Sequence, residues 1–267
     1  MKIINDGKVE IENTHMEYVA FGKGNKTLVL VPGLGDGMKT VKGAGLLLSR
    51  IYKKFANDFR VFVFSRRNVL PKDFSTRDMA HDLNFAFEKL GLSDIYLLGV
   101  SQGGMISQFY SIDFPAKVKK LIIAVSLSRQ NPTSKKVIGS WIRMIKNEEF
   151  KKLAIDTMEK TYVGKKLKKM RFTYPLMGFL GKPKSAERFL IQAKACFNHD
   201  SHDELVKIKT PTLVVGGLKD MIVGGTASKE IAKAIPDSKL IEYPNLGHGA
   251  SDEKIFIQDA LNFFNND

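Results

Sequence analysis

Residues 95–109 read IYLLGVSQGGMISQF, an apolar run that leads through a glycine-bounded serine into a helix-compatible segment. Residues 95–98 favour a strand and residues 104–111 favour a helix. Between them lies the pattern G-x-S-x-G, with Ser101 at its centre and Gly99 and Gly103 on either side. Larger side chains at the flanking positions would clash with the adjoining strand and helix, and the sharp turn lifts the serine hydroxyl out of the sheet edge. The stretch therefore predicts a strand, a strained turn and a helix, with an accessible serine at the turn.

The rest of the chain alternates short buried strands with amphipathic helices. Apolar runs predict strands at residues 8–20 (an edge hairpin), 27–31, 61–64, 95–100, 121–125, 212–215 and 239–243. Helical patterns occupy residues 41–55, 76–90, 226–235 and 253–264, and Ser75 or Thr76 is the expected N-cap of the second. This alternation predicts an α/β fold, a mostly parallel, doubly wound sheet of about eight strands.

The alternation stops between about residues 127 and 205. This stretch contains no buried strand pattern, but it is amphipathic and is interrupted by Pro132, Pro175 and Pro183. We expect an inserted helical cap at 127–205 on a core formed by residues 1–126 and 206–267. We find no internal repeat.

Polar and glycine-rich loops follow the carboxyl ends of the predicted strands. They lie at residues 32–37, at 66–72 (a polar loop with Arg66 and Arg67), at Ser101, at Asp220 and at His248. In open parallel sheets the carboxyl ends of the strands gather the functional side chains. These loops are therefore the expected site.

A serine hydroxyl needs a base within hydrogen-bonding reach, and the base needs an acid that orients it. Of the five histidines, only His248 follows a core strand at its carboxyl end, between Gly247 and Gly249. Asp220 follows the strand at 212–215, whereas the strand at 121–125 ends in Ser-Leu-Ser without a carboxylate. We therefore predict Ser101 as nucleophile, His248 as base and Asp220 as the orienting acid.

The order Ser101, Asp220, His248, together with the turn and the alternating strands, resembles the α/β-hydrolase superfamily over about residues 8–264. Three further segments resemble family pieces: residues 74–83 the helix before the nucleophile strand, residues 211–217 the acid strand and residues 245–248 the histidine loop. The serine distinguishes the chain from the haloalkane dehalogenases and epoxide hydrolases of the superfamily, which use aspartate at this position.

The resemblance implies an oxyanion hole built from two backbone N–H groups, those of Gln102 and Leu34. Many members begin the second loop with His-Gly, whereas this chain has Pro32-Gly33. Because the donor is a backbone group, we expect the hole to be retained without the support of that histidine. A dinucleotide-binding interpretation of the loop is weak, since the third glycine of G-x-G-x-x-G would fall at Met38.

The insert is expected to determine the substrate. It is rich in methionine and aromatic residues, and some of these should form an apolar pocket over Ser101. The pocket residues that we predict are Gly33, Trp141, Met144 and Met177. They suggest a small to medium apolar acyl or alcohol group.

Basic residues are concentrated in the same insert. The net charge is +14, and residues 129–184 contain 15 Lys and Arg against 4 Asp and Glu, a net of +11. This pattern is typical of a solvated helical face, but it also fits an anionic ligand or lipid surface. Arg66, Arg67 or the lysines of the insert are candidates for selecting an anionic substrate. Nucleic acid is not an expected partner, because groove-reading elements are missing.

Other residues carry weaker signals. His199, Asp200, His202, Asp203 and Glu204 match no standard zinc spacing, so we predict no metal site and no cofactor. Cys196 is the single cysteine and is expected to be a small packed residue rather than a nucleophile. The N-terminus has no apolar segment of signal-peptide length, and no run has the length of a membrane span, so we expect a cytoplasmic protein.

The sequence thus predicts a serine hydrolase that cleaves a carboxylic ester or related acyl compound through an acyl-enzyme. A lysophospholipase-like or monoacylglycerol-lipase-like enzyme, a thioesterase, a peptidase, a lactonase and a carbon–carbon bond hydrolase remain alternatives on the same three residues. A non-catalytic ligand receptor on this fold is a further alternative. The natural substrate and the oligomeric state are not encoded in any motif of this chain.

Overall fold

The computed structural model describes residues 4–177 and 181–266. Its described strands form one eight-stranded sheet in the order β1-β2-β4-β3-β5-β6-β7-β8. These strands are β1 (Asn5–Ile11), β2 (Thr14–Phe21), β3 (Lys26–Val31), β4 (Phe59–Arg67), β5 (Ile95–Val100), β6 (Val118–Ala124), β7 (Thr212–Gly217) and β8 (Ser238–Tyr243). β2 pairs antiparallel with both β1 and β4, and all pairs from β4 to β8 along the sheet are parallel. The predicted α/β fold is confirmed.

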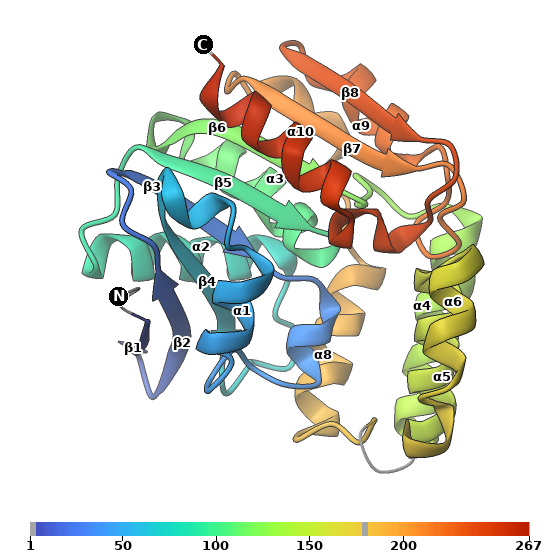
Figure 1. Ribbon diagram of the computed structural model, residues 1–267. Coiled ribbons are helices and arrows are strands. Elements are labelled where there is room, and N and C mark those ends of the chain that lie inside the picture. Colours follow the sequence, from blue (N-terminus) through green and yellow to red (C-terminus); the bar gives the residue numbers. More distant parts are fainter. Residues whose placement is uncertain (1–3, 178–180, 267) are drawn as a thin grey trace.

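Helices cover both faces of the sheet because the central strands are apolar on both sides (Figure 1). One face of the sheet, which includes Val29 of β3, packs against α2 (Thr76–Lys89), α3 (Gln102–Asp113) and α9 (Ala227–Ala234). The other face, with Leu28 and Leu30, packs against α1 (Gly45–Ile51) and α10 (Lys254–Asn265). Ser75 caps α2 in a reciprocal pair with Asp78. These layers hold the carboxyl ends of β3 to β8 along one edge.

One predicted loop is part of a strand. Arg66 and Arg67 were expected in a polar loop, but β4 extends to Arg67 and both side chains are buried. Pairing of Arg67 with Met16 of β2 extends the strand beyond its apolar run. The guanidinium of Arg67 is paired with Asp82 and with Glu12, which explains how a charged residue can be buried there. The loop begins only at Asn68, so the loop prediction was wrong for Arg66 and Arg67.

The described residues between β6 and β7 form helices and no strand. These are α4 (Pro132–Lys146), α5 (Phe150–Thr161), α6 (Gly164–Arg171) and α8 (Ala186–Phe197), with the short 3-10 turns η4 (Tyr174–Leu176) and η5 (His202–Lys207). We call α4 to α8 the inserted helices. The N-cap Asn131 and the following Pro132 start α4, and Ser185 caps α8. In Figure 1 the inserted helices lie below the carboxyl ends of the strands. Among the described residues, no helix combines the length and the hydrophobicity needed to cross a bilayer.

Candidate active site

Ser101 occupies a sharp turn between β5 and α3. Its φ of 54° and ψ of −116° lie in a region that side chains rarely adopt, so the surrounding contacts must hold it there. The Ser101 backbone N–H donates to the carbonyl of Ala124 at 2.9 Å, and the Ser126 hydroxyl donates to the carbonyl of Ser101 at 2.8 Å. A Cβ at Gly103 would lie 1.9 Å from the carbonyl oxygen of Val31, so this position accepts only glycine. The turn predicted from the sequence is present.

Ser101, His248 and Asp220 form one chain of hydrogen bonds. His248 Nε2 lies 2.9 Å from Ser101 Oγ, and His248 Nδ1 lies 2.7 Å from Asp220 Oδ2. The Asp220 side chain is 2% exposed and that of His248 is 11% exposed. The three side chains come from the ends of β5, β7 and β8. The structure therefore brings together the three residues that the sequence selected.

The second oxygen of Asp220 is also engaged. Asp220 Oδ1 accepts hydrogen bonds from the backbone N–H groups of Ile222 and Val223, at 2.8 and 3.0 Å. These two bonds fix the plane of the carboxylate. Asp220 is thus held as an acceptor for the Nδ1–H of His248.

The His248 loop contacts the junction between α5 and α6. A Cβ at Gly249 would lie 2.7 Å from the ring of Tyr162, so glycine allows this ring to pack against the loop. The Tyr162 hydroxyl donates to Asp252 Oδ2 at 2.9 Å, and Lys166 Nζ donates to Glu253 at 2.8 Å. Burial and Asp252 raise the pKa of Tyr162, which keeps its hydroxyl a donor. The inserted helices therefore contact the loop that carries the predicted base.

The loop after β3 lies on the other side of Ser101. A Cβ built on Gly33 would lie 3.8 Å from Ser101 Oγ, so Gly33 borders the serine hydroxyl. Within residues 4–177 and 181–266, the backbone N–H groups of Leu34 and Gln102 donate to no other residue. Gln102 stands at the first position of α3, where N–H groups are free of helical partners. Both groups remain available as donors.

A buried cluster of charged and polar side chains contacts this loop. Arg188 of α8 donates to Asp36 Oδ2 at 2.7 Å, and Gln192 donates to the same oxygen at 3.1 Å. Arg66 donates to the carbonyl of Pro32, the residue before Gly33. Burial lowers the pKa of Arg66, and the carboxylate of Asp36 opposes that effect. The Arg67 guanidinium is paired with Asp82 and Glu12. Arg66 is buried, but its Nε and Nη1 have no described hydrogen-bond partner, so its role in selecting an anionic substrate stays a prediction.

Gln102 also links the serine turn to α8. Its side-chain Nε2 donates to the carbonyl of Gln192 at 2.9 Å. Sequence reasoning named Gln102 only for its backbone, and it missed Asp36, Arg188 and Tyr162. The single available signal was an aspartate within the glycine-rich loop at 32–37, which alone does not indicate its partners.

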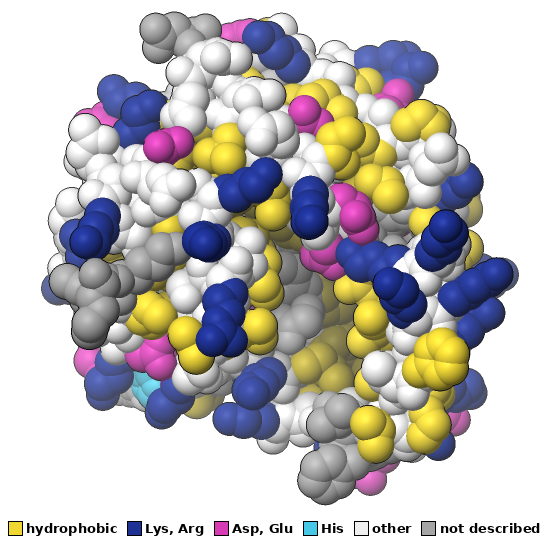
Figure 2. All heavy atoms as spheres, viewed as in Figure 1, with side chains coloured by type: hydrophobic (Ala, Val, Ile, Leu, Met, Phe, Trp, Pro, Cys, Tyr) yellow, Lys and Arg dark blue, Asp and Glu magenta, His cyan; other side chains and the backbone are white. Residues whose placement is uncertain are grey.

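The predicted pocket residues are distributed unevenly. Trp141 and Met144 of α4 belong to a buried cluster that also contains Leu34 and Met105, next to the serine turn. Met177 is buried but is not a described member of that cluster. Figure 2 shows this face hollowed between α8 and the α4–α6 helices, with hydrophobic side chains on the walls and Lys and Arg side chains around the rim.

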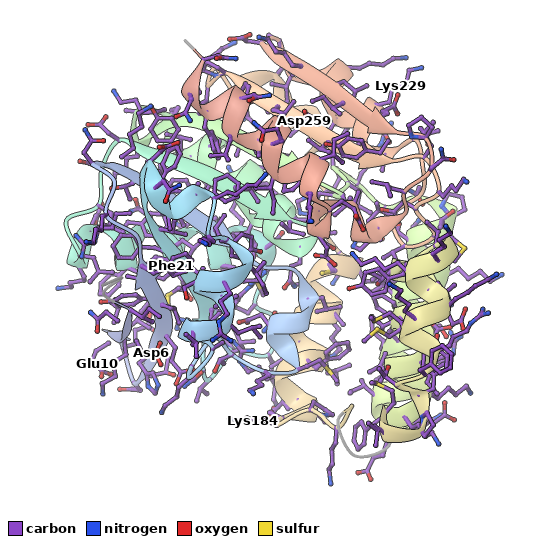
Figure 3. The ribbon with its side chains drawn as sticks, in the orientation of Figure 1. Asp6, Glu10, Phe21, Lys184, Lys229 and Asp259 are labelled. Atoms are coloured by element: carbon purple, nitrogen blue, oxygen red, sulfur yellow. The ribbon has the colours of Figure 1, made fainter. Side chains whose placement is uncertain are left out.

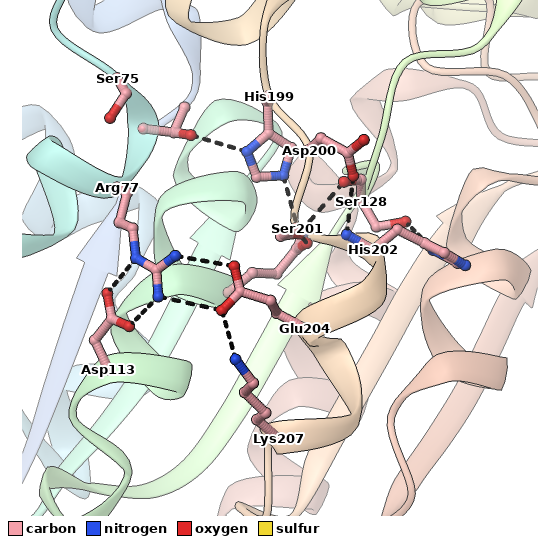
Figure 4. Close-up of polar contacts among 12 residues, drawn as sticks. Ser75, Arg77, Asp113, Ser128, His199, Asp200, Ser201, His202, Glu204 and Lys207 are labelled. Atoms are coloured by element: carbon pink, nitrogen blue, oxygen red, sulfur yellow. Dashed lines mark hydrogen bonds and ion pairs between the residues drawn. The ribbon is translucent and has the colours of Figure 1, made fainter.

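Four of the residues considered for a metal site, His199, Asp200, His202 and Glu204, have other partners (Figure 4). His199 contacts the hydroxyls of Thr76 and Ser201, and burial lowers its pKa to about 3. Glu204 accepts from Arg77 and Lys207. Within the described part of the chain, no group of three His, Cys, Asp or Glu side chains is arranged to hold a metal ion. Cys196 is buried in α8, and burial raises the pKa of its thiol to about 12.

Comparison with known proteins gives consistent matches. The family model described as alpha/beta hydrolase fold matches residues 26–255. The putative carbamate hydrolase RutD of Pseudomonas syringae is 25% identical over 257 residues, which cover 89% of this chain and 90% of that protein. The 2-hydroxy-6-oxononadienedioate/2-hydroxy-6-oxononatrienedioate hydrolase 2 of Pseudomonas putida is 24% identical over 260 residues, 92% of this chain and 88% of that protein.

A solved structure shows the same fold. An alpha/beta hydrolase enzyme from a Medee basin deep-sea metagenome library superposes with a TM-score of 0.83 at 18% identity, over 98% of both chains. The family match covers most of the chain, and the curated relatives are named as hydrolases. The chain therefore belongs to the alpha/beta hydrolase fold family and is a hydrolase.

Proposed function

We propose that the chain is a serine hydrolase that cleaves a carboxylic ester or related acyl compound. The observation that carries the proposal is the hydrogen-bonded chain from Ser101 Oγ through His248 to Asp220. A nucleophile, a base and an orienting acid in this order are the components of acyl transfer through a covalent intermediate.

The geometry supports a two-step reaction. Ser101 Oγ attacks the carbonyl carbon while His248 Nε2 accepts the serine proton, and Asp220 stabilises the imidazolium. His248 then protonates the leaving alcohol, which leaves an acyl-enzyme on Ser101. A water molecule that is deprotonated by His248 hydrolyses this ester and restores the serine.

The charge on the carbonyl oxygen needs donors in both steps. The Leu34 and Gln102 N–H groups flank Ser101 and have no other described acceptor, so they fit an oxyanion hole. No cofactor is needed, because every proton transfer uses a side chain of this protein.

The substrate enters, in this proposal, through the hollow between α8 and α4–α6. Residues 127–205 then act as a cap on the core of residues 1–126 and 206–267. Trp141 and Met144, which share a cluster with Leu34, are the proposed pocket wall, and Gly33 keeps the space beside Ser101 open. Residues 1–3, 178–180 and 267 lie outside the described residues. Met177, which is buried at the end of the 3-10 turn η4, stays a candidate wall residue.

A fluorophosphonate probe tests the nucleophile. We expect wild-type protein to be labelled and Ser101→Ala to be unlabelled, with Ser140→Ala in α4 as a control that keeps labelling. We expect Asp220→Asn to lower kcat by about 10⁴, because the imidazole loses its orientation. If the wild-type protein is neither labelled nor active on any activated ester, the serine-hydrolase proposal fails and a ligand receptor becomes the better explanation.

A substrate panel then identifies the class. p-Nitrophenyl esters of increasing chain length, measured beside thioesters, lactones, peptides, monoacylglycerols and lysophospholipids, separate the alternatives on the same three residues. The names of the relatives add a carbamate and a 2-hydroxy-6-oxononadienedioate to the panel. We expect simple esters to be turned over fastest, with no activity in Ser101→Ala.

A further inference from the structure

One face of α6 is exposed, cationic and without a partner. Lys165, Lys168 and Lys169 are exposed, and their spacing places them on one side of the helix with Phe172. Within residues 4–177 and 181–266 these three lysines form no ion pair, whereas the neighbouring Lys166 and Arg171 both do. α6 contains no acidic residue that could neutralise this face. We call Lys165, Lys168, Lys169, Phe172 and Leu176 the α6 surface.

Two large apolar side chains lie at one end of these lysines. Phe172 is 84% exposed and Leu176 is 59% exposed. Single exposed apolar residues are ordinary, but a phenylalanine and a leucine four residues apart, beside a row of unpaired lysines, form an amphipathic combination. In Figure 2, Lys and Arg side chains line the right edge, where α6 lies, and hydrophobic side chains follow below them.

The other side of α6 faces the protein. Leu167 and Met170 are half-buried, Lys166 is paired with Glu253, and the Lys166 ammonium lies 4.8 Å from the centre of the Tyr162 ring. The outer face is therefore not needed to hold the helix in place. Its lysines and apolar residues have no described partner within the chain.

We propose that the α6 surface docks on a bilayer that contains anionic phospholipid. Lysines near such a surface attract its headgroups, and apolar side chains at the same level insert among the acyl chains. A nucleic acid would also attract the lysines, but it gives no reason for the exposure of Phe172 and Leu176. An anionic lipid surface therefore accounts for both the unpaired lysines and the exposed apolar residues of the α6 surface. This binding goes beyond the proposed hydrolysis and does not depend on it.

Vesicle co-sedimentation of the full chain tests the proposal. The probe is a vesicle of equal parts phosphatidylglycerol and phosphatidylcholine, compared with pure phosphatidylcholine. We expect binding to the anionic vesicles alone and a loss on the order of 100-fold in the triple variant Lys165→Glu, Lys168→Glu, Lys169→Glu. Phe172→Ala with Leu176→Ala should weaken binding less, and should remove the part that survives high salt.

A matched control separates this surface from the general positive charge. Lys229 and Lys233 of α9 and Lys239 of β8 are exposed outside the inserted helices, and Figure 3 labels Lys229 above α6. Their change to Glu gives the same net charge as the α6 triple variant. We expect this control to bind like wild type, and all variants to keep the wild-type Tm. Ser101→Ala should bind normally, which makes the result independent of the proposed catalysis.

Three results would overturn the proposal. The first is absence of wild-type binding to anionic vesicles. The second is an equal loss of vesicle binding in the α6 triple variant and in the control triple variant, which would mean that binding depends on the overall positive charge and not on the α6 surface. The third is a combination of two results: a DNA duplex binds and this binding is lost in the α6 triple variant, and vesicle binding is unchanged by Phe172→Ala with Leu176→Ala. That combination would indicate a surface for polyanions in general.

Discussion

α8 and α6 both contact a loop of the candidate site, but they are attached to the core in different ways. α8 reaches the loop after β3 through Arg188 and Asp36, whose side chains are 8% and 0% exposed. α6 reaches the His248 loop through Lys166 and Glu253, each 34% exposed. Breaking a buried pair leaves an uncompensated charge, whereas an exposed pair is largely replaced by water. The loop after β3 is therefore held by α8 much more strongly than the His248 loop is held by α6.

The largest expected effect on the stability of the protein comes from Asp36→Ala. The buried Arg188 guanidinium would lose its ion-pair partner, and the buried Arg66 guanidinium would lose a nearby opposite charge, so we expect the free energy of unfolding to fall by about 3–5 kcal/mol. Urea denaturation measures this loss, and kcat on an activated ester should fall because the Leu34 N–H is no longer held. The double variant Asp36→Leu, Arg188→Met should recover part of the stability. A change below about 1 kcal/mol for Asp36→Ala would contradict the comparison.

A smaller effect is expected on the histidine side. Tyr162→Phe removes the hydrogen bond to Asp252 but keeps the ring against Gly249, so the free energy of unfolding should change by about 0.5–1.5 kcal/mol. We expect a few-fold decrease in kcat, because the His248 loop loses one restraint. Tyr174→Phe is the matched control, since its hydroxyl bonds Glu159 away from that loop. An equal decrease in kcat for both variants would show that Tyr162 has no specific role.

The smallest effect is expected for Lys166→Gln. Its ion pair with Glu253 is partly exposed, so the free energy of unfolding should change by less than about 1 kcal/mol, and less at high salt. Thermal unfolding at two salt concentrations measures this. Lys152→Gln, which removes the exposed pair with Glu149, should behave alike. A loss as large as that of Asp36→Ala would mean that α6 is as firmly attached as α8.

The sequence was sufficient for the fold and for the grouping of Ser101, His248 and Asp220. Buried parallel strands are continuous apolar runs, and each of these residues follows such a run, so the shared sheet edge brings them together. The turn at Ser101 adds a local signal, because its glycines are required by close backbone contacts.

The supporting contacts could not be predicted in the same way. The Arg67 end of β4 is set by pairing with β2, a long-range register that the local residues 65–67 do not reveal. Asp36 and Arg188 are 152 residues apart, and the two segments carry no reciprocal pattern. Charged residues in a sequence usually indicate the surface, so nothing in the local sequence indicates that Asp36, Arg66 and Arg188 are buried together.

The burial of Cys196 has a practical consequence. A thiol that is enclosed in α8, with its pKa raised to about 12, supplies almost no thiolate at neutral pH and should not react with maleimides in the folded protein. Since this is the chain's single cysteine, the native protein behaves as a cysteine-free background for labelling. A Phe172→Cys variant would then carry one reactive thiol, to which an environment-sensitive dye can be attached without any change to α8.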